Sequence, residues 1–134
     1  MNGITRDGLS FHETGSGNPV SYSAAVRSGD LIVTAGQTAV GPGAEPMAFR
    51  QQAELALRRV IAAVEAAGGN VETIVKVTGY LADLDDWPAY DEVYRSIISV
   101  DPKPARTTVE VVRFPPPILV EVDAIAVACK QSGE

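Results

Sequence analysis

The sequence predicts an α+β fold in which one sheet carries two helices on a single face. Two segments repeat apolar residues at the spacing of one helix face, and each lies between segments rich in β-branched residues. The last β segment is apolar on both sides, whereas a strand with one face in water alternates. Two helices cover only one side of a sheet. We therefore expect another copy of the chain on the second side, with a sheet curled on itself as the alternative.

The N-terminal part is predicted to form short strands. Residues 1–18 are rich in Gly, Ser, Thr and Asn and are expected to be mostly loop, with an additional short strand near residues 9–12. Residues 21–27 and 30–37 carry β-branched and apolar side chains on either side of the turn Ser28-Gly29-Asp30. That pattern indicates a hairpin.

The first helix is predicted over residues 47–67. One of its faces is apolar and the other carries Gln, Glu and Arg. Gly68-Gly69 is expected to end it, because glycine readily adopts the left-handed conformation found at helix C-termini. The apolar face consists of Ala53, Leu57, Val60, Ile61 and Val64.

The second helix is predicted to follow Asp85-Asp86, which supply an N-cap and negative charge at the positive end of the helix dipole. Pro88 falls in the first turn, where a missing N–H does no harm. Asp101-Pro102 is expected to stop the helix. Its apolar face consists of Tyr90, Val93, Tyr94, Ile97 and Ile98.

Three further strands are predicted, over residues 75–82, 107–114 and 118–128, with a run of three prolines between the last two. The element order is therefore β-β-α-β-α-β-β. No repeat, low-complexity tract or linker divides the sequence, so we expect a single domain over residues 1–134.

Composition and charge narrow the class of protein. Hydrophobic residues make up 46% of the chain, charged residues 21%, and the mean hydropathy is +0.07, which indicates a folded domain. The net charge of −6 repels phosphate backbones, so we expect no nucleic-acid partner. No apolar stretch reaches the roughly 20 residues that cross a bilayer, so no membrane partner is expected. The lack of an apolar leader and the single cysteine predict a cytoplasmic location.

The sequence also lacks the patterns of several cofactor and nucleophile sites. One histidine and one cysteine exclude a His/Cys metal cluster and make a Cys–His dyad very improbable. No phosphate-binding glycine loop and no serine-hydrolase motif is present. We therefore expect no metal and no cofactor.

Two carboxylates in the most apolar strand are the main candidates for chemistry. Glu121 and Asp123 lie two residues apart and so point to the same face, between Leu119 and Ile125. A carboxylate in such surroundings is usually paired, protonated or at a cleft. Arg106 is the nearest candidate partner in the sequence, and its planar fork also matches a substrate carboxylate. The alternative is a salt bridge that fixes the sheet register or an interface.

Other polar residues have plainer interpretations. His12 is expected at the surface or in a loop, and Cys129 as a small packing residue or a thiol at a frayed strand end. Tyr22 is expected to pack on the first strand of the hairpin. Asp91 falls off the apolar stripe of the second helix.

An ordered set of short motifs between residues 19 and 128 resembles the RidA/YjgF family, also known as the L-PSP or translation initiation inhibitor family. Each motif is weak alone, but Pro-Ala-Arg followed by the acidic last strand is specific. The motifs are Tyr22-Ser23-x-Ala25-Val26, Gly29-Asp30-Leu31, Ala35-Gly36-Gln37, Ala66-Ala67-Gly68-Gly69, Lys76-Val77-Thr78, Leu81-x-Asp83, Pro104-Ala105-Arg106 and Val120-Glu121-Val122-Asp123-Ala124.

The resemblance implies a chorismate-mutase-like mixed sheet, a homotrimer and clefts between its subunits. It also implies cofactor-independent hydrolysis of enamines and imines to 2-oxo acids and ammonia. Arg106 matches the family arginine that holds the substrate carboxylate, and Glu121 matches the glutamate that positions water. Gly36 matches a glycine whose backbone contacts the substrate, and Tyr22 a tyrosine that lines the cleft.

Three substrate-binding positions differ from the common family pattern. Ala35 replaces a serine, Thr108 a cysteine, and Asp91 an asparagine. These differences indicate a divergent branch and motivate one alternative, a regulatory trimer that binds small carboxylates without turnover. The resemblance brings a second alternative, an endoribonuclease or translation inhibitor, against which the acidic net charge argues.

Overall fold

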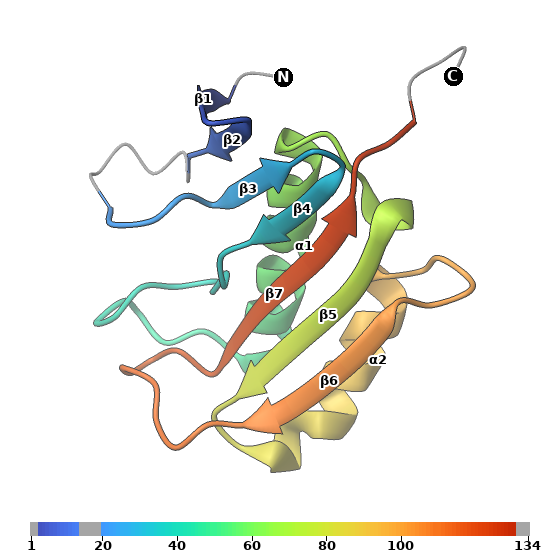
Figure 1. Cartoon of the computed structure of the whole chain (residues 1–134). Helices are drawn as coiled ribbons and strands as arrows, with labels where there is room; N and C mark the ends of the chain where they lie inside the picture. The colour runs from blue at the N-terminus through green and yellow to red at the C-terminus, as the bar shows by residue number, and fades with distance from the viewer. Residues whose placement is uncertain (1–2, 14–19, 131–134) are drawn as a thin grey trace.

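The computed structural model describes residues 3–13 and 20–130, which form one sheet with two helices (Figure 1). The sheet has seven strands in the order β1-β2-β3-β4-β7-β5-β6. β5 and β6 run parallel and every other neighbouring pair is antiparallel, so the sheet is mixed. The strands are β1 (Ile4–Arg6), β2 (Leu9–His12), β3 (Ala25–Ser28), β4 (Leu31–Thr34), β5 (Ile74–Leu81), β6 (Ala105–Glu110) and β7 (Val120–Val127).

Both helices lie on the same face of the sheet, as predicted (Figure 1). α1 (Phe49–Ala66) packs on the middle of the sheet, and α2 (Trp87–Ile97) packs beside it. After α1 the amides of Gly68 and Gly69 bond the carbonyls of Glu65 and Val64 at 3.0 and 2.9 Å, the pattern of a Schellman cap. Gly68 has φ 103°, a conformation that glycine adopts without strain. The predicted role of this Gly-Gly pair is confirmed.

The start of α2 differs in one detail from the prediction. Pro88 lies in the first turn, but the Asp86 side chain makes no cap hydrogen bond. Asp83 instead accepts a hydrogen bond from the Asp85 amide and caps the short 3₁₀ helix η2 (Leu84–Asp86), which leads into α2. A second 3₁₀ helix, η1 (Val71–Thr73), leads into β5. No helix in the described residues is both long and apolar enough to span a bilayer.

The core fills the space between the helices and the sheet. On β7 the residues that face the helices are fully buried, whereas the residues between them are more exposed. On the opposite face, Ile125 and Val127 lie beside Val33 and Leu31 of β4. All four of these side chains are at least 38% exposed, because both helices cover the other side. The apolar second face is therefore present as predicted, and the copy of the chain expected to cover it stays a prediction.

Several predicted boundaries and environments need correction. The hairpin strands are shorter than 21–27 and 30–37, so Tyr22 lies in a loop before β3 and is 56% exposed instead of packed on a strand. The β6 strand ends at Glu110, before the predicted end. His12 is not at the surface: it is 5% exposed in β2 because its ring packs against Gly3, which has no side chain, and burial lowers its pKa. Residues 14–19 of the predicted N-terminal loop lie outside the described residues.

Candidate functional site

Arg106 lies at the start of β6, the edge strand next to β5, and its side chain points toward α2. Its Nη1 donates a hydrogen bond to Asp91 Oδ1 at 2.9 Å. The guanidinium carbon lies 4.6 Å from the ring centre of Tyr94 and 5.5 Å from that of Trp87, distances typical of cation–π contacts. The side chain is 20% exposed. Arg106 is therefore held in a fixed orientation without being sealed from solvent.

Asp91 joins two arginines on this side of the chain. Its Oδ2 lies 3.0 Å from Nε of Arg95, one helical turn further along α2, while Oδ1 accepts from Arg106. The hydrogen bond from Arg106 is the main cause that lowers the pKa of Asp91. Asp91 is therefore ionised at neutral pH, and it leaves the other N–H groups of both guanidiniums available.

A cavity of about 470 Å³ opens beside Arg106. Its lining consists of Asp91, Tyr94, Arg95, Lys103, Pro104 and Arg106. Thr108 follows two residues after Arg106 on the same strand, and therefore faces the same side. Its Oγ1 is buried and has no hydrogen-bond partner in the described part of the chain. The lining of the cavity therefore combines the guanidinium of Arg106 with the positive charges of Arg95 and Lys103.

Glu121 lies on the open face of the sheet, near the start of β7, the chain's most apolar strand. It stands opposite Tyr80 of β5, whose hydroxyl donates a hydrogen bond to Asp123 Oδ2 at 2.9 Å. Burial, and secondarily the charge of Asp123, raises the pKa of Glu121 above its ordinary value of 4.5. The Glu121 carboxyl group has no ion-pair or hydrogen-bond partner within residues 3–13 and 20–130. It is thus a carboxyl group of raised basicity that is free to bind water.

The segment after β4 places Gly36 directly beside Glu121. Gln37 exchanges two backbone hydrogen bonds with Val122, of 2.8 and 3.0 Å, which fix this segment against β7. A Cβ on Gly36 would collide with Glu121 Oε2 and would lie 2.7 Å from its Cδ. Gly36 and Tyr22 also line a second cavity, of about 590 Å³. Ala35 lies next to Gly36, and its amide bonds the Ala24 carbonyl at 2.8 Å.

Arg106 and Glu121 lie on opposite faces of the sheet within one chain. Arg106 is in register with Val77 of β5, a buried residue of the helix-covered face, whereas Glu121 is in register with Tyr80. Residues paired across neighbouring strands point to the same side, and positions 77 and 80 of one strand point to opposite sides. Arg106 is therefore not the partner of Glu121 and Asp123 in the same chain, a correction to the sequence-based expectation.

Two features of the site were not anticipated from the sequence. Trp87 stacks against Arg106, and Arg95 and Lys103 add positive charge to the cavity. A signal for Arg95 was present, because an acid and a base four residues apart on a helix commonly pair. The stacking on Trp87 depends on how α2 packs on β6, which no local pattern reveals.

Replacing Gly36 by Ala is expected to lower 10- to 100-fold the rate of any reaction that depends on the Glu121 carboxylate, because the new Cβ displaces that carboxylate from its position. The free energy of unfolding should change by less than about 1 kcal/mol, since the displaced group is the end of a flexible side chain. Gly8→Ala is the control for activity, because Gly8 lines neither cavity and a Cβ there meets no atom within 4 Å, although its φ of 81° makes the substitution cost some stability. Steady-state kinetics and thermal unfolding of both variants test this, and equal activities would show that the close approach has no functional role.

Comparison with known proteins places the chain in a family. The profile of the family described as Endoribonuclease L-PSP matches residues 17–128. The 2-iminobutanoate/2-iminopropanoate deaminase of Escherichia coli is 39% identical over 110 residues, covering 79% of this chain and 86% of that protein. The chain therefore belongs to the Endoribonuclease L-PSP family, and its resemblance to RidA and YjgF proteins is confirmed.

Solved structures support the same assignment. A Mycobacterium tuberculosis member of the YjgF/YER057c/UK114 family is 31% identical, with a TM-score of 0.77, and the match covers 90% of this chain and 99% of that chain. TdcF of Escherichia coli, solved with bound serine, is 33% identical with a TM-score of 0.76, over 89% of this chain and 98% of that chain. The predicted fold class is confirmed. Two relatives from Escherichia coli are named as deaminases, and these names support imine deaminase activity at the level of the family.

Proposed function

We propose that this protein hydrolyses 2-imino acids to 2-oxo acids and ammonia. Water adds to the C=N carbon, a proton moves to nitrogen, and the resulting carbinolamine expels ammonia as its hydroxyl group becomes the C=O. The substrate nitrogen leaves as ammonia and the water oxygen stays in the 2-oxo acid. A protonated imine is already electrophilic, so the step needs orientation, placed water and charge stabilisation and no metal or cofactor.

Arg106 is the residue that would bind the substrate carboxylate. Asp91 takes one hydrogen bond from Nη1, and no other hydrogen bond to the guanidinium is made by the described residues. The stacked rings keep the fork in one orientation, which lowers the entropy lost when a carboxylate binds. Thr108 and Asp91 would complete this side of the site. One observation carries the proposal: Asp91, Tyr94 and Trp87 hold the Arg106 guanidinium in place beside a cavity.

Glu121 is the residue that would position and deprotonate the attacking water. Its raised pKa makes the carboxylate a better base than an exposed glutamate. The backbone of Gly36, which lies against the carboxyl group, would contact the substrate, with Tyr22 and Ala35 beside it.

We infer that the complete site forms between two copies of the chain in a homotrimer. Arg106 and Glu121 face opposite sides of one sheet, so a small substrate can meet both only if they come from different copies. Two features support such an assembly: β6 is an edge strand whose outer side pairs with no described strand, and the open face exposes Leu31, Val33, Ile125 and Val127.

The decisive experiment is hydrolysis of an imine generated in the assay by an amino-acid oxidase, with semicarbazide as the competing trap. The protein is expected to lower the yield of semicarbazone and to accelerate the release of ammonia. Binding of pyruvate without any effect on the imine would instead identify a regulatory carboxylate-binding protein. Cleavage of RNA that Arg106→Ala abolishes would favour the endoribonuclease named in the family description, against which the net charge of −6 argues. The cytoplasmic location remains a prediction.

A further inference from the structure

Two cations that the proposed reaction does not use line the same cavity as Arg106. They are Arg95 of α2 and Lys103 of the segment before β6. Three of the chain's 11 basic residues thus surround this cavity, against one of its 17 acidic residues, although the net charge of the whole chain is −6. A single carboxylate needs one guanidinium. The additional positive charge therefore points to a substrate that carries more than one negative charge.

Asp91 fixes the spacing between Arg95 and Arg106. Each guanidinium contacts a different oxygen of the same carboxyl group, at 3.0 and 2.9 Å. The two guanidiniums are therefore close enough for one small molecule to reach both. The Arg95 side chain is 73% exposed and contacts Asp91 through Nε, so its Nη groups are accessible to a ligand in the cavity.

Lys103 supplies a third positive charge to the lining of the cavity. Its Nζ donates to the carbonyl of Ile98 at 2.7 Å, which anchors the ammonium near the C-terminus of α2. An anchored ammonium loses little entropy on meeting an anion. Its field adds to that of the two guanidiniums instead of being cancelled by a nearby carboxylate.

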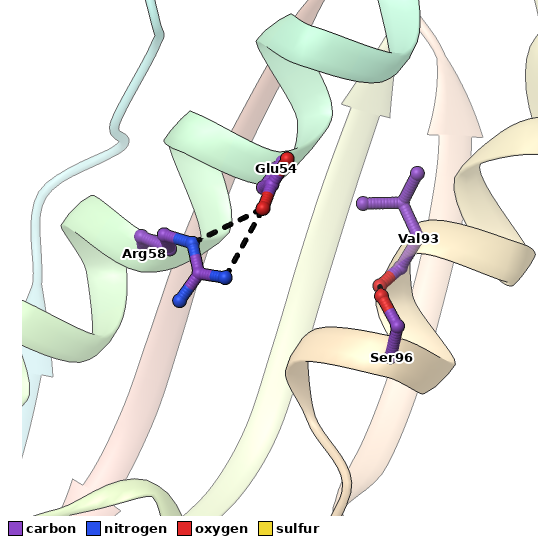
Figure 2. A network of polar contacts seen from close by, with 4 residues as sticks. All are labelled: Glu54, Arg58, Val93 and Ser96. Carbon is purple, nitrogen blue, oxygen red and sulfur yellow. Dashed lines mark hydrogen bonds and ion pairs between the residues drawn. The ribbon is translucent and has the colours of Figure 1, made fainter.

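A pair elsewhere in the chain shows what an ordinary surface contact looks like. Glu54 and Arg58 of α1 have the same four-residue spacing as Asp91 and Arg95, with Arg58 Nη2 3.1 Å from Glu54 Oε1 (Figure 2). Both side chains are at least half exposed, and neither lines the Arg106 cavity. Such a pair stabilises its helix slightly and does nothing more. Arg95 differs because its acidic partner also holds Arg106.

We propose that the substrate of this site is a dicarboxylic imino acid such as 2-iminosuccinate or 2-iminoglutarate, whose distal carboxylate binds Arg95 with help from Lys103. The inference rests on the proposed function, because Arg106 binds the carboxylate next to the imine carbon. Arg95 is then a specificity-determining residue. It selects the acidic side chain of the substrate and takes no part in the hydrolysis.

The test compares stable oxo-acid analogues by calorimetry. 2-Oxoglutarate carries the second carboxylate and pyruvate lacks it. The wild-type protein is expected to bind 2-oxoglutarate more tightly than pyruvate, and Arg95→Gln should reduce the ratio of the two affinities about tenfold, equivalent to about 1.4 kcal/mol. Lys103→Gln should reduce it less. Arg58→Gln, the matched control on α1, should leave the ratio unchanged. Competition between the corresponding imines in the ammonia assay measures the same preference in turnover.

The preference for dicarboxylates and the hydrolysis of imines can be tested separately. Tighter binding of pyruvate by the wild type, or an Arg95→Gln variant that weakens both ligands equally, would overturn the dicarboxylate preference even if imines are hydrolysed. Conversely, an Arg95-dependent preference for 2-oxoglutarate without any imine hydrolysis would support the preference and overturn the deaminase.

Discussion

Replacing Arg106 by Lys is expected to lower kcat/KM for an imino acid about a hundredfold, equivalent to about 3 kcal/mol of lost transition-state binding. The ammonium keeps the positive charge but cannot offer two parallel N–H groups to a carboxylate, and it does not reproduce the planar stacking on Tyr94 and Trp87. Arg106→Ala, which also removes the charge, should reduce activity further. Initial rates of ammonia release over a range of imine concentrations measure both effects.

The control for Arg106 must separate binding from folding. Arg106 is 20% exposed, and Asp91 keeps its contact with Arg95 when Arg106 is replaced, so the thermal midpoint should fall by only a few degrees. Arg58→Lys makes the same chemical change in an exposed pair on α1 and should retain full activity. Unchanged turnover in Arg106→Lys, with the protein folded, would show that this guanidinium does not hold the substrate.

Those parts of the fold that depend on local pattern could be predicted from the sequence. The apolar stripe that ends at Val64 and the glycine pair after it define α1, and Pro88 marks the first turn of α2. The alternation on β7 correctly placed Glu121 on the same face as Ile125. In each case one short segment contains the whole signal, because helix caps and strand parity are set by neighbouring residues.

The arrangement of the candidate site depended on relations between segments. Whether Arg106 faces the side of Glu121 follows from the register of β6, β5 and β7, and β5 also has an irregularity between Ile74 and Lys76. A shift of one residue in register reverses the face of every side chain on a strand. The His12 ring likewise lies against Gly3, across the pairing of β1 with β2. Such contacts leave no periodic trace in the sequence.

Replacing Glu121 by Gln is expected to lower kcat about a hundredfold or more, with a much smaller effect on KM. The amide keeps the size of the side chain beside Gly36 but cannot accept the proton of the attacking water. In the wild type, kcat/KM should fall as the pH is lowered through the pKa of Glu121, which burial holds above 4.5. This acidic limb of the pH profile should be absent from the residual activity of Glu121→Gln, and its persistence there would assign it to another group.

The stability of Glu121→Gln provides an internal check on that result. Because burial raises the pKa of Glu121, the folded chain keeps this proton to a higher pH than the unfolded chain does. The stabilising effect of the protonated carboxyl group is therefore lost as the pH rises through the folded-state pKa. At neutral pH the variant, which has no charge to bury, should be at least as stable as the wild type. A loss of activity without a loss of stability then isolates the chemical role of the carboxylate.

Mixing the two inactive variants tests where Arg106 and Glu121 meet. If each site takes Arg106 from one copy and Glu121 from its neighbour, trimers refolded from equal amounts of Arg106→Ala and Glu121→Gln chains contain some sites with both native residues. Random assembly around a three-fold axis should restore about a quarter of the wild-type activity. If both residues acted within one chain, every site would lack one of them and the mixture would stay inactive. Recovery of activity would therefore follow directly from their positions on opposite faces of the sheet.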